Sequence, residues 1–203
     1  HKSIVQAGGT LEFRDGRFVI SRNAVAIRPT MVENSGTLLL PQGLCWVGDE
    51  PTSGADLAKQ FQLKQLAGEM LIGGDFTKIG EEENSRRGKM SFVFSGGVLS
   101  ATNVVVFRNG TTRNGRETFA EVAANAAVEV RVQGADSMLD MSLFTYGANA
   151  SVTKNGLGRL VMAARPANLA VNAGAVEFAT ALTDWAGVTL ADGAKVVWGA
   201  RGN

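Results

Sequence analysis

Histidine and cysteine are almost missing from the 203 residues, and His1 and Cys45 are the single examples of each. One cysteine excludes a disulfide within the chain. One terminal histidine leaves Ser-His-Asp and Cys-His catalytic arrangements, and His-rich metal sites, without their central side chain. Cys45 lies in the apolar run Leu44-Cys45-Trp46-Val47, so we expect a buried packing residue rather than a reactive thiol. We therefore expect a protein that is not an enzyme and that holds no catalytic residue, cofactor or metal ion.

Charge of one sign and long apolar runs are also lacking. The 20 Lys and Arg residues and the 19 Asp and Glu residues give a net charge of +1, and the two signs are interspersed. Nucleic-acid binding needs a clustered basic face, so we expect no nucleic-acid partner. No apolar run approaches the ~18 residues of a membrane span, so we expect no membrane-spanning segment.

Proline and aromatic residues are scarce, whereas glycine is abundant. There are 4 Pro, 7% aromatic residues and 25 Gly, accompanied by many Val, Leu, Ala, Thr and Asn residues. Turn residues that recur every 8 to 12 positions between short apolar runs are typical of all-β folds built from short strands. We expect one β-rich domain over residues 1–203, and because the pattern runs up to both ends, we expect this domain to be a segment of a longer chain.

A loose repeat supports that interpretation. The tripeptide Gly-Thr-Leu begins at Gly9 and again at Gly36, 27 residues later. Similar corners, each followed by alternating apolar residues, occur at Gly68, Gly97, Ala127, Gly158, Gly174 and Gly193. Periods of 20 to 50 residues indicate solenoids, in which each unit needs its neighbours to cover its apolar face. The pattern predicts a parallel β-solenoid.

Residues 152–178 carry the clearest copy of the repeat. The repeat consists here of Val152-Thr153-Lys154, Gly156, Gly158 and Leu160, followed by Val171-Asn172-Ala173-Gly174 and Val176. At these positions the chain resembles the autotransporter-associated β-strand repeat, a building unit of secreted bacterial surface proteins. The spacer at 163–168 is shorter and plainer than the family's usual one. The resemblance implies a single right-handed parallel β-helix, a secreted or cell-surface location, and no catalytic residues.

Three polar segments interrupt the repeat, at 48–62, 78–88 and 108–116, and we expect them to protrude as loops. The second is the most polar stretch of the chain. It contains Glu81, Glu82, Glu83, Arg86 and Arg87. We interpret these charges as a solvated loop, with a sugar or Ca²⁺ contact as the functional alternative.

Paired carboxylates are the enzyme alternative that the residue inventory allows. A β-helix that cleaves polysaccharide would use two carboxylates about 5 to 9.5 Å apart. Asp49 with Asp56, Asp75 with Glu81–Glu83, and Asp136 with Asp140 are the candidate pairs. Trp185 is the tryptophan that we expect to be exposed, and it is a further candidate for contact with a ligand.

The favoured function is therefore structural. We expect a rigid or adhesive segment of an autotransporter-like bacterial protein, whose partners are a carbohydrate or a protein on a host or neighbouring surface. A polysaccharide lyase or hydrolase is one alternative. Unpaired strands at both ends raise a second alternative, in which copies stack end to end as a homo-oligomeric fibre or lattice.

Overall fold

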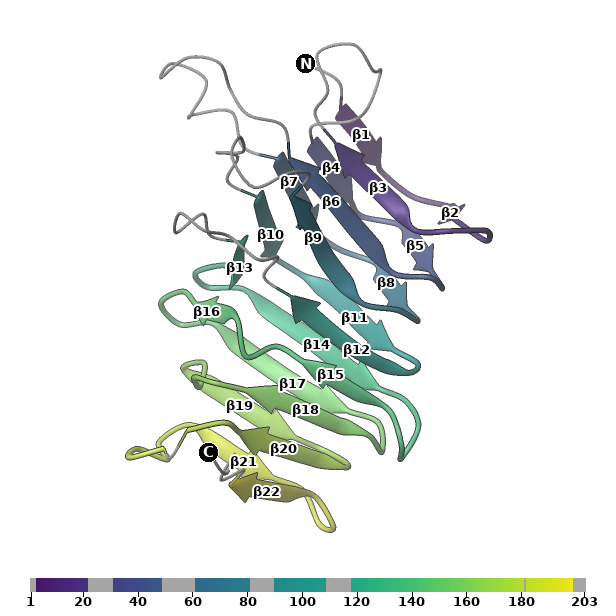
Figure 1. Cartoon of the computed structure of the whole chain (residues 1–203). Coiled ribbons are helices and arrows are strands. Elements are labelled where there is room, and N and C mark those ends of the chain that lie inside the picture. Colours follow the sequence, from purple (N-terminus) through teal and green to yellow (C-terminus); the bar gives the residue numbers. More distant parts are fainter. Residues whose placement is uncertain are drawn as a thin grey trace.

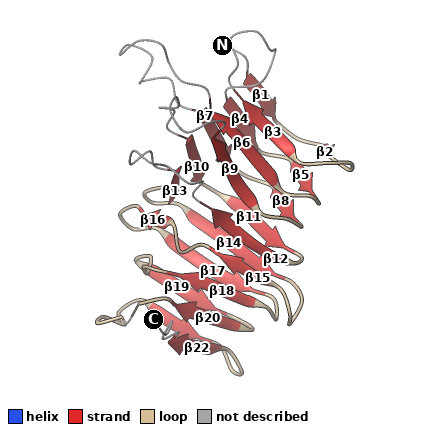
Figure 2. Ribbon diagram, in the orientation of Figure 1, coloured by secondary structure: helices blue, strands red, loops and turns tan. Residues whose placement is uncertain are grey.

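The computed structural model describes residues 3–21, 31–48, 61–80, 90–108, 118–180 and 182–198. All regular structure in these ranges is β-strand, as Figure 2 shows. Each pairing between the strands is parallel. The predicted all-β class and the parallel pairing are thus confirmed. Within the same ranges, no helix has the length and apolar character needed to cross a membrane.

The strands form three sheets. Sheet A has six strands, which are β1 (Ser3–Gln6), β4 (Met31–Asn34), β7 (Phe61–Gln65), β10 (Met90–Phe94), β13 (Thr118–Val122) and β16 (Phe144–Tyr146). Sheet B has eight, which are β2 (Thr10–Glu12), β5 (Thr37–Leu40), β8 (Glu69–Ile72), β11 (Gly97–Ala101), β14 (Ala127–Val132), β17 (Ser151–Asn155), β19 (Asn168–Val171) and β21 (Val188–Leu190). Sheet C has eight, which are β3 (Phe18–Ser21), β6 (Leu44–Gly48), β9 (Phe76–Gly80), β12 (Val104–Arg108), β15 (Met138–Asp140), β18 (Arg159–Met162), β20 (Ala175–Phe178) and β22 (Lys195–Trp198).

The chain visits the three sheets in a fixed order. From β1 to β18, consecutive strands enter sheets A, B and C in turn. From β19 to β22 they alternate between sheets B and C, so sheet A stops two strands earlier than the others. Figure 1 shows the strands stacked in sequence order, from β1 near the N-terminus to β22 near the C-terminus.

Glycines turn the chain from sheet A into sheet B. Gly68 and Gly97 have positive φ angles of 67° and 79°. The amide of Glu69 donates to the carbonyl of Gly36 at 3.0 Å, and the amide of Val98 donates to that of Gly68 at 2.8 Å. A Cβ on Gly68 would collide with the Gly36 carbonyl. The stacked corners therefore need glycine both for its conformation and for the closeness of the backbones.

The repeat predicted from the sequence placed corners of two different kinds in one series. Gly9, Gly36, Gly68, Gly97 and Ala127 precede or begin strands of sheet B, whereas Gly158, Gly174 and Gly193 precede strands of sheet C. The offset from Gly158 to Gly174 is 16 residues and that from Gly174 to Gly193 is 19, because those segments lack a strand in sheet A. The single series predicted from the sequence was wrong in this respect.

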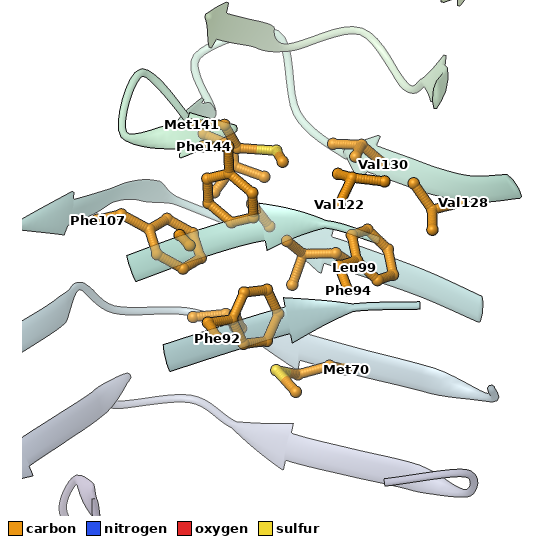
Figure 3. Close-up of a cluster of buried hydrophobic side chains, with 14 of the residues drawn as sticks. Met70, Phe92, Phe94, Leu99, Phe107, Val122, Val128, Val130, Met141 and Phe144 are labelled. Atoms are coloured by element: carbon orange, nitrogen blue, oxygen red, sulfur yellow. The ribbon is translucent and has the colours of Figure 1, made fainter. Parts of the chain in front are cut away.

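The core is built from side chains in register on successive strands. In sheet B, Leu38, Met70, Leu99 and Val130 follow one another across β5, β8, β11 and β14, and all are fully buried. Phenylalanines gather in the middle of the stack, where the rings of Phe92, Phe107 and Phe144 lie among these aliphatic side chains (Figure 3). Each large apolar side chain buried in this way contributes about 1.5–3 kcal/mol, so each strand depends on its neighbours.

Cys45 is a buried free thiol, as predicted. Two amides are also buried, Asn34 at the end of β4 and Gln65 at the end of β7. Asn34 Nδ2 donates to Gln65 Oε1 at 2.7 Å, and Gln65 Nε2 donates to the carbonyl of Ala67 at 2.6 Å. These bonds pair the Asn34 and Gln65 amide groups at the corners, where the backbone leaves the sheet, although Asn34 Oδ1 is buried without a hydrogen-bond partner.

Candidate functional site at Trp185

Trp185 lies in the connection between β20 and β21, on the part of the chain that has no strand in sheet A. Its relative exposure is 37%, which confirms the predicted exposure. The indole meets the ring of Phe178 edge to face, with centroids 6.3 Å apart and an interplanar angle of 87°. The buried Phe178 thus anchors a tryptophan that still presents part of its surface to solvent.

Arg165 holds this connection in place. It lies in the connection between β18 and β19, which like the one between β20 and β21 leads from sheet C to sheet B. Its Nη1 donates to the carbonyls of Pro166 and Ala167, both at 3.1 Å, and to that of Ala186 at 2.5 Å. Its Nη2 donates to Asp184 Oδ2 at 2.6 Å. One guanidinium therefore joins the β18–β19 connection to the β20–β21 connection, using the several donors that its planar geometry provides.

Asp184 completes the site. Its Oδ1 accepts a hydrogen bond from the backbone amide of Ala186 at 2.9 Å. This bond, together with the Arg165 guanidinium, lowers the pKa of the Asp184 carboxyl, so it is ionised at neutral pH. The Asp184 side chain is 65% exposed and the Arg165 side chain 17%, so solvent screens the ion pair and its own contribution to stability is small. Its effect is to fix the backbone on both sides of Trp185.

We call Arg165, Asp184 and Trp185 the Trp185 site. A half-exposed indole on a fixed backbone offers an apolar face with a polar edge, which suits stacking on a sugar ring. Both carboxylate oxygens of Asp184 accept hydrogen bonds from protein donors. The arrangement favours contact with a ligand over acid–base chemistry.

Three of the candidate paired carboxylates lie in the described residues, Asp75, Asp136 and Asp140. Asp75 Oδ1 accepts a hydrogen bond from the amide of Val106 at 3.0 Å, and Asp140, which is 7% exposed, accepts one from the amide of Ser142 at 2.9 Å. Asp136 is exposed on the connection between β14 and β15. Asp75 and Asp140 thus support the backbone where strands of sheet C begin or end.

The predicted loops at 48–62, 78–88 and 108–116 lie mostly outside the described residues, but their ends belong to strands β6, β7, β9 and β12. The five residues proposed as ligand contacts, Glu81, Glu82, Glu83, Arg86 and Arg87, also lie outside the described residues. The same holds for Asp49 and Asp56. Within the described ranges, no group of three or more His, Cys, Asp and Glu side chains is placed to hold a metal ion.

The outer face of sheet B carries a second polar cluster. Arg131 on β14 donates to Glu129 at 2.8 Å and to Glu69 on β8 at 3.4 Å. Ser100 on β11 donates to the same oxygen of Glu69 at 2.5 Å. These opposite charges pair with one another across three strands, so this face has no strong charge of either sign to offer a partner.

Sequence reasoning found Trp185 but missed Arg165 and Asp184. Asp184 had a local signal, because an aspartate often accepts the amide two residues later, as it does here from Ala186. Arg165 had none, since its partners lie 19 and 21 residues further along the chain.

Comparison with protein-family models, curated proteins and solved structures finds no match to this chain. The resemblance of residues 152–178 to the autotransporter-associated repeat therefore stays a prediction.

Proposed function

We propose that the chain is a segment of a right-handed parallel β-helix that acts as a rigid, non-enzymatic spacer or adhesive element of a secreted or cell-surface bacterial protein. The fixed order of sheets A, B and C supports the helical winding, since each return to a sheet completes one turn. The handedness rests on a general rule. Crossover connections between parallel strands of one sheet are right-handed in about 98% of cases.

One observation carries the proposal. A single column of outward residues runs in register through all eight strands of sheet B, namely Thr10, Thr37, Glu69, Val98, Glu129, Thr153, Ala170 and Thr189. A ladder without a slip over eight strands, above a continuous apolar core, resists bending. Such a body suits a spacer that holds other parts of a protein away from a surface.

The two alternatives have less support. For an enzyme, Asp75, Asp136 and Asp140 are the described candidates. Asp75 and Asp140 each already accept a backbone hydrogen bond, which leaves the exposed Asp136 without a described carboxylate of the same kind to pair with. For an end-to-end fibre, the two ends differ. The set β1 to β3 occupies all three sheets, whereas the last set of described strands, β21 and β22, occupies sheets B and C alone.

The Trp185 site is the contact surface that we propose for a carbohydrate on a host or neighbouring cell. The experiment is a binding screen on printed bacterial and host polysaccharides, with wild type, Trp185→Ala and Leu157→Ala. Leu157 is the matched control because it is a large, exposed side chain on a different corner. We expect Trp185→Ala to weaken the binding of any retained glycan about tenfold, and Leu157→Ala to leave it unchanged.

The same polysaccharides, incubated with the protein, are analysed for new reducing ends and unsaturated products. We expect neither. Cleavage would contradict the spacer proposal. Equal binding by Trp185→Ala and wild type would exclude the Trp185 site as the contact, and absence of all glycan binding would exclude a carbohydrate partner.

A further inference from the structure

Lys154 is a charged side chain in the interior of the stack. It lies on β17 and has no exposed surface. Its neighbours in register are Val130 on β14 and Val171 on β19, both fully buried. A lysine in an apolar column is costly unless its amine finds hydrogen-bond partners, so its contacts show what it does there.

The amine reaches three backbone carbonyls. Lys154 Nζ donates to Gly156 O at 2.5 Å, to Gly158 O at 2.6 Å and to Ala173 O at 2.8 Å. Gly156 and Gly158 belong to the corner between β17 and β18, whereas Ala173 belongs to the corner between β19 and β20. The side chain therefore joins the β17–β18 corner to the β19–β20 corner from the interior of the stack.

This junction is the place where the stack loses a sheet. The strand before β17 is β16, the last of sheet A. Beyond it, β19 and β20 pair with β17 and β18 through sheets B and C alone. Other side-chain bonds cross the same boundary on the outside, such as Asn172 Nδ2 to Asn155 Oδ1 at 3.0 Å, which is exposed to competing water. Lys154 instead makes its crossing bond, to Ala173, from a side chain that has no exposed surface.

We propose that β19 to β22 form a two-sheet unit that opens separately from the three-sheet body, β1 to β18, and that the Lys154 amine is the buried fastener between them. Segments with fewer buried contacts open at lower free energy than the core of a protein. The two-sheet unit is of this kind, since Leu190 on β21 is 50% exposed although its partner in register on β19, Val171, is fully buried. This inference does not depend on the spacer function.

Native-state hydrogen exchange at neutral pH, followed by mass spectrometry, tests the separate opening on the wild-type chain. We expect the amides of β19 to β22 to exchange through an opening that leaves β5, β8 and β11 protected. Exchange of all these strands through a single common opening would overturn the proposal.

The role of the Lys154 amine is tested with Lys154→Met, which keeps an apolar side chain of similar length and removes the hydrogen-bond donors. We expect β19 and β20 to exchange at least about tenfold faster, with β5, β8 and β11 unchanged. Lys195→Met is the control, because Lys195 is an exposed lysine on β22 of the same unit. Unchanged exchange of β19 and β20 in Lys154→Met would overturn the role of Lys154, and so would an equal acceleration in Lys195→Met.

Discussion

At the scale of single residues, burial and hydrogen bonding act on Lys154 in opposite directions. Burial lowers the pKa of its amine to about 8 because the charged form loses its hydration. The three carbonyl oxygens around Nζ provide acceptors in return. A neutral amine can still donate two of these bonds, so loss of the proton weakens the link between the corners without breaking it.

The lowered pKa predicts a pH dependence of stability. The amine has a pKa of about 8 in the folded chain and 10.5 as a free side chain. Between these values the unfolded state binds more protons, so the free energy of unfolding rises with pH. Relative to Lys154→Met, wild type should gain up to about 3 kcal/mol between pH 8 and 10.5, and nothing below pH 7. Urea unfolding of both proteins across this range measures the difference. If the free energies of unfolding of wild type and Lys154→Met changed equally with pH, the lowered pKa of Lys154 would be contradicted.

At the scale of strands and corners, the sequence was most informative where the backbone has a special requirement. Gly9, Gly68, Gly97, Gly174 and Gly193 were predicted as corners and have positive φ angles, whereas Gly36 and Gly158, predicted in the same series, do not and are instead closely approached by neighbouring backbone. The prediction succeeded because few side chains tolerate that conformation. It missed which corner each glycine makes, since a change of sheet leaves no mark on the residue itself. The loss of sheet A showed only in the shortened offsets after Gly158.

Gly68 provides the test of the stacked corners. Gly68→Ala introduces a side chain at φ 67° and drives its Cβ into the Gly36 carbonyl, so we expect a loss of about 1–3 kcal/mol in the free energy of unfolding. Gly8→Ala is the control, because a Cβ there meets nothing within 4 Å and its φ is not positive. Equal stability of the two variants in urea denaturation would mean that the close backbone contact at Gly68 is not maintained in solution.

For the Trp185 site too, the sequence predicted a local property but not the contacts between distant segments. A tryptophan among polar and small residues was predicted to be exposed, and its local context was sufficient for that. The hydrogen bonds that fix the backbone around Trp185 depend on Arg165, whose bonds to Asp184 and Ala186 join separate connections. Such contacts depend on how closely the two connections stack in the fold, and the sequence of either connection alone does not predict that distance.

At the scale of the whole molecule, sheets B and C run from the first strands to the last, whereas sheet A ends at β16. Local patterns predicted parallel strands, because Gly-bounded apolar segments recur at solenoid spacing. The number of sheets, and the narrowing from three to two after β18, emerged from the pairing of strands. A continuous stack of this kind has a fixed length, which is the property that a spacer needs.

The most direct test is the distance between Thr10 and Thr189, which lie on the outer face of sheet B at opposite ends of one register column. Both are replaced by cysteine in a Cys45→Ala background, labelled with nitroxides and studied by pulsed electron paramagnetic resonance. Seven strand spacings predict a narrow distance distribution near 34 Å, about 5 Å longer than in a Thr37→Cys, Thr189→Cys pair. A broad distribution, or equal distances for the two pairs, would contradict the continuous stack.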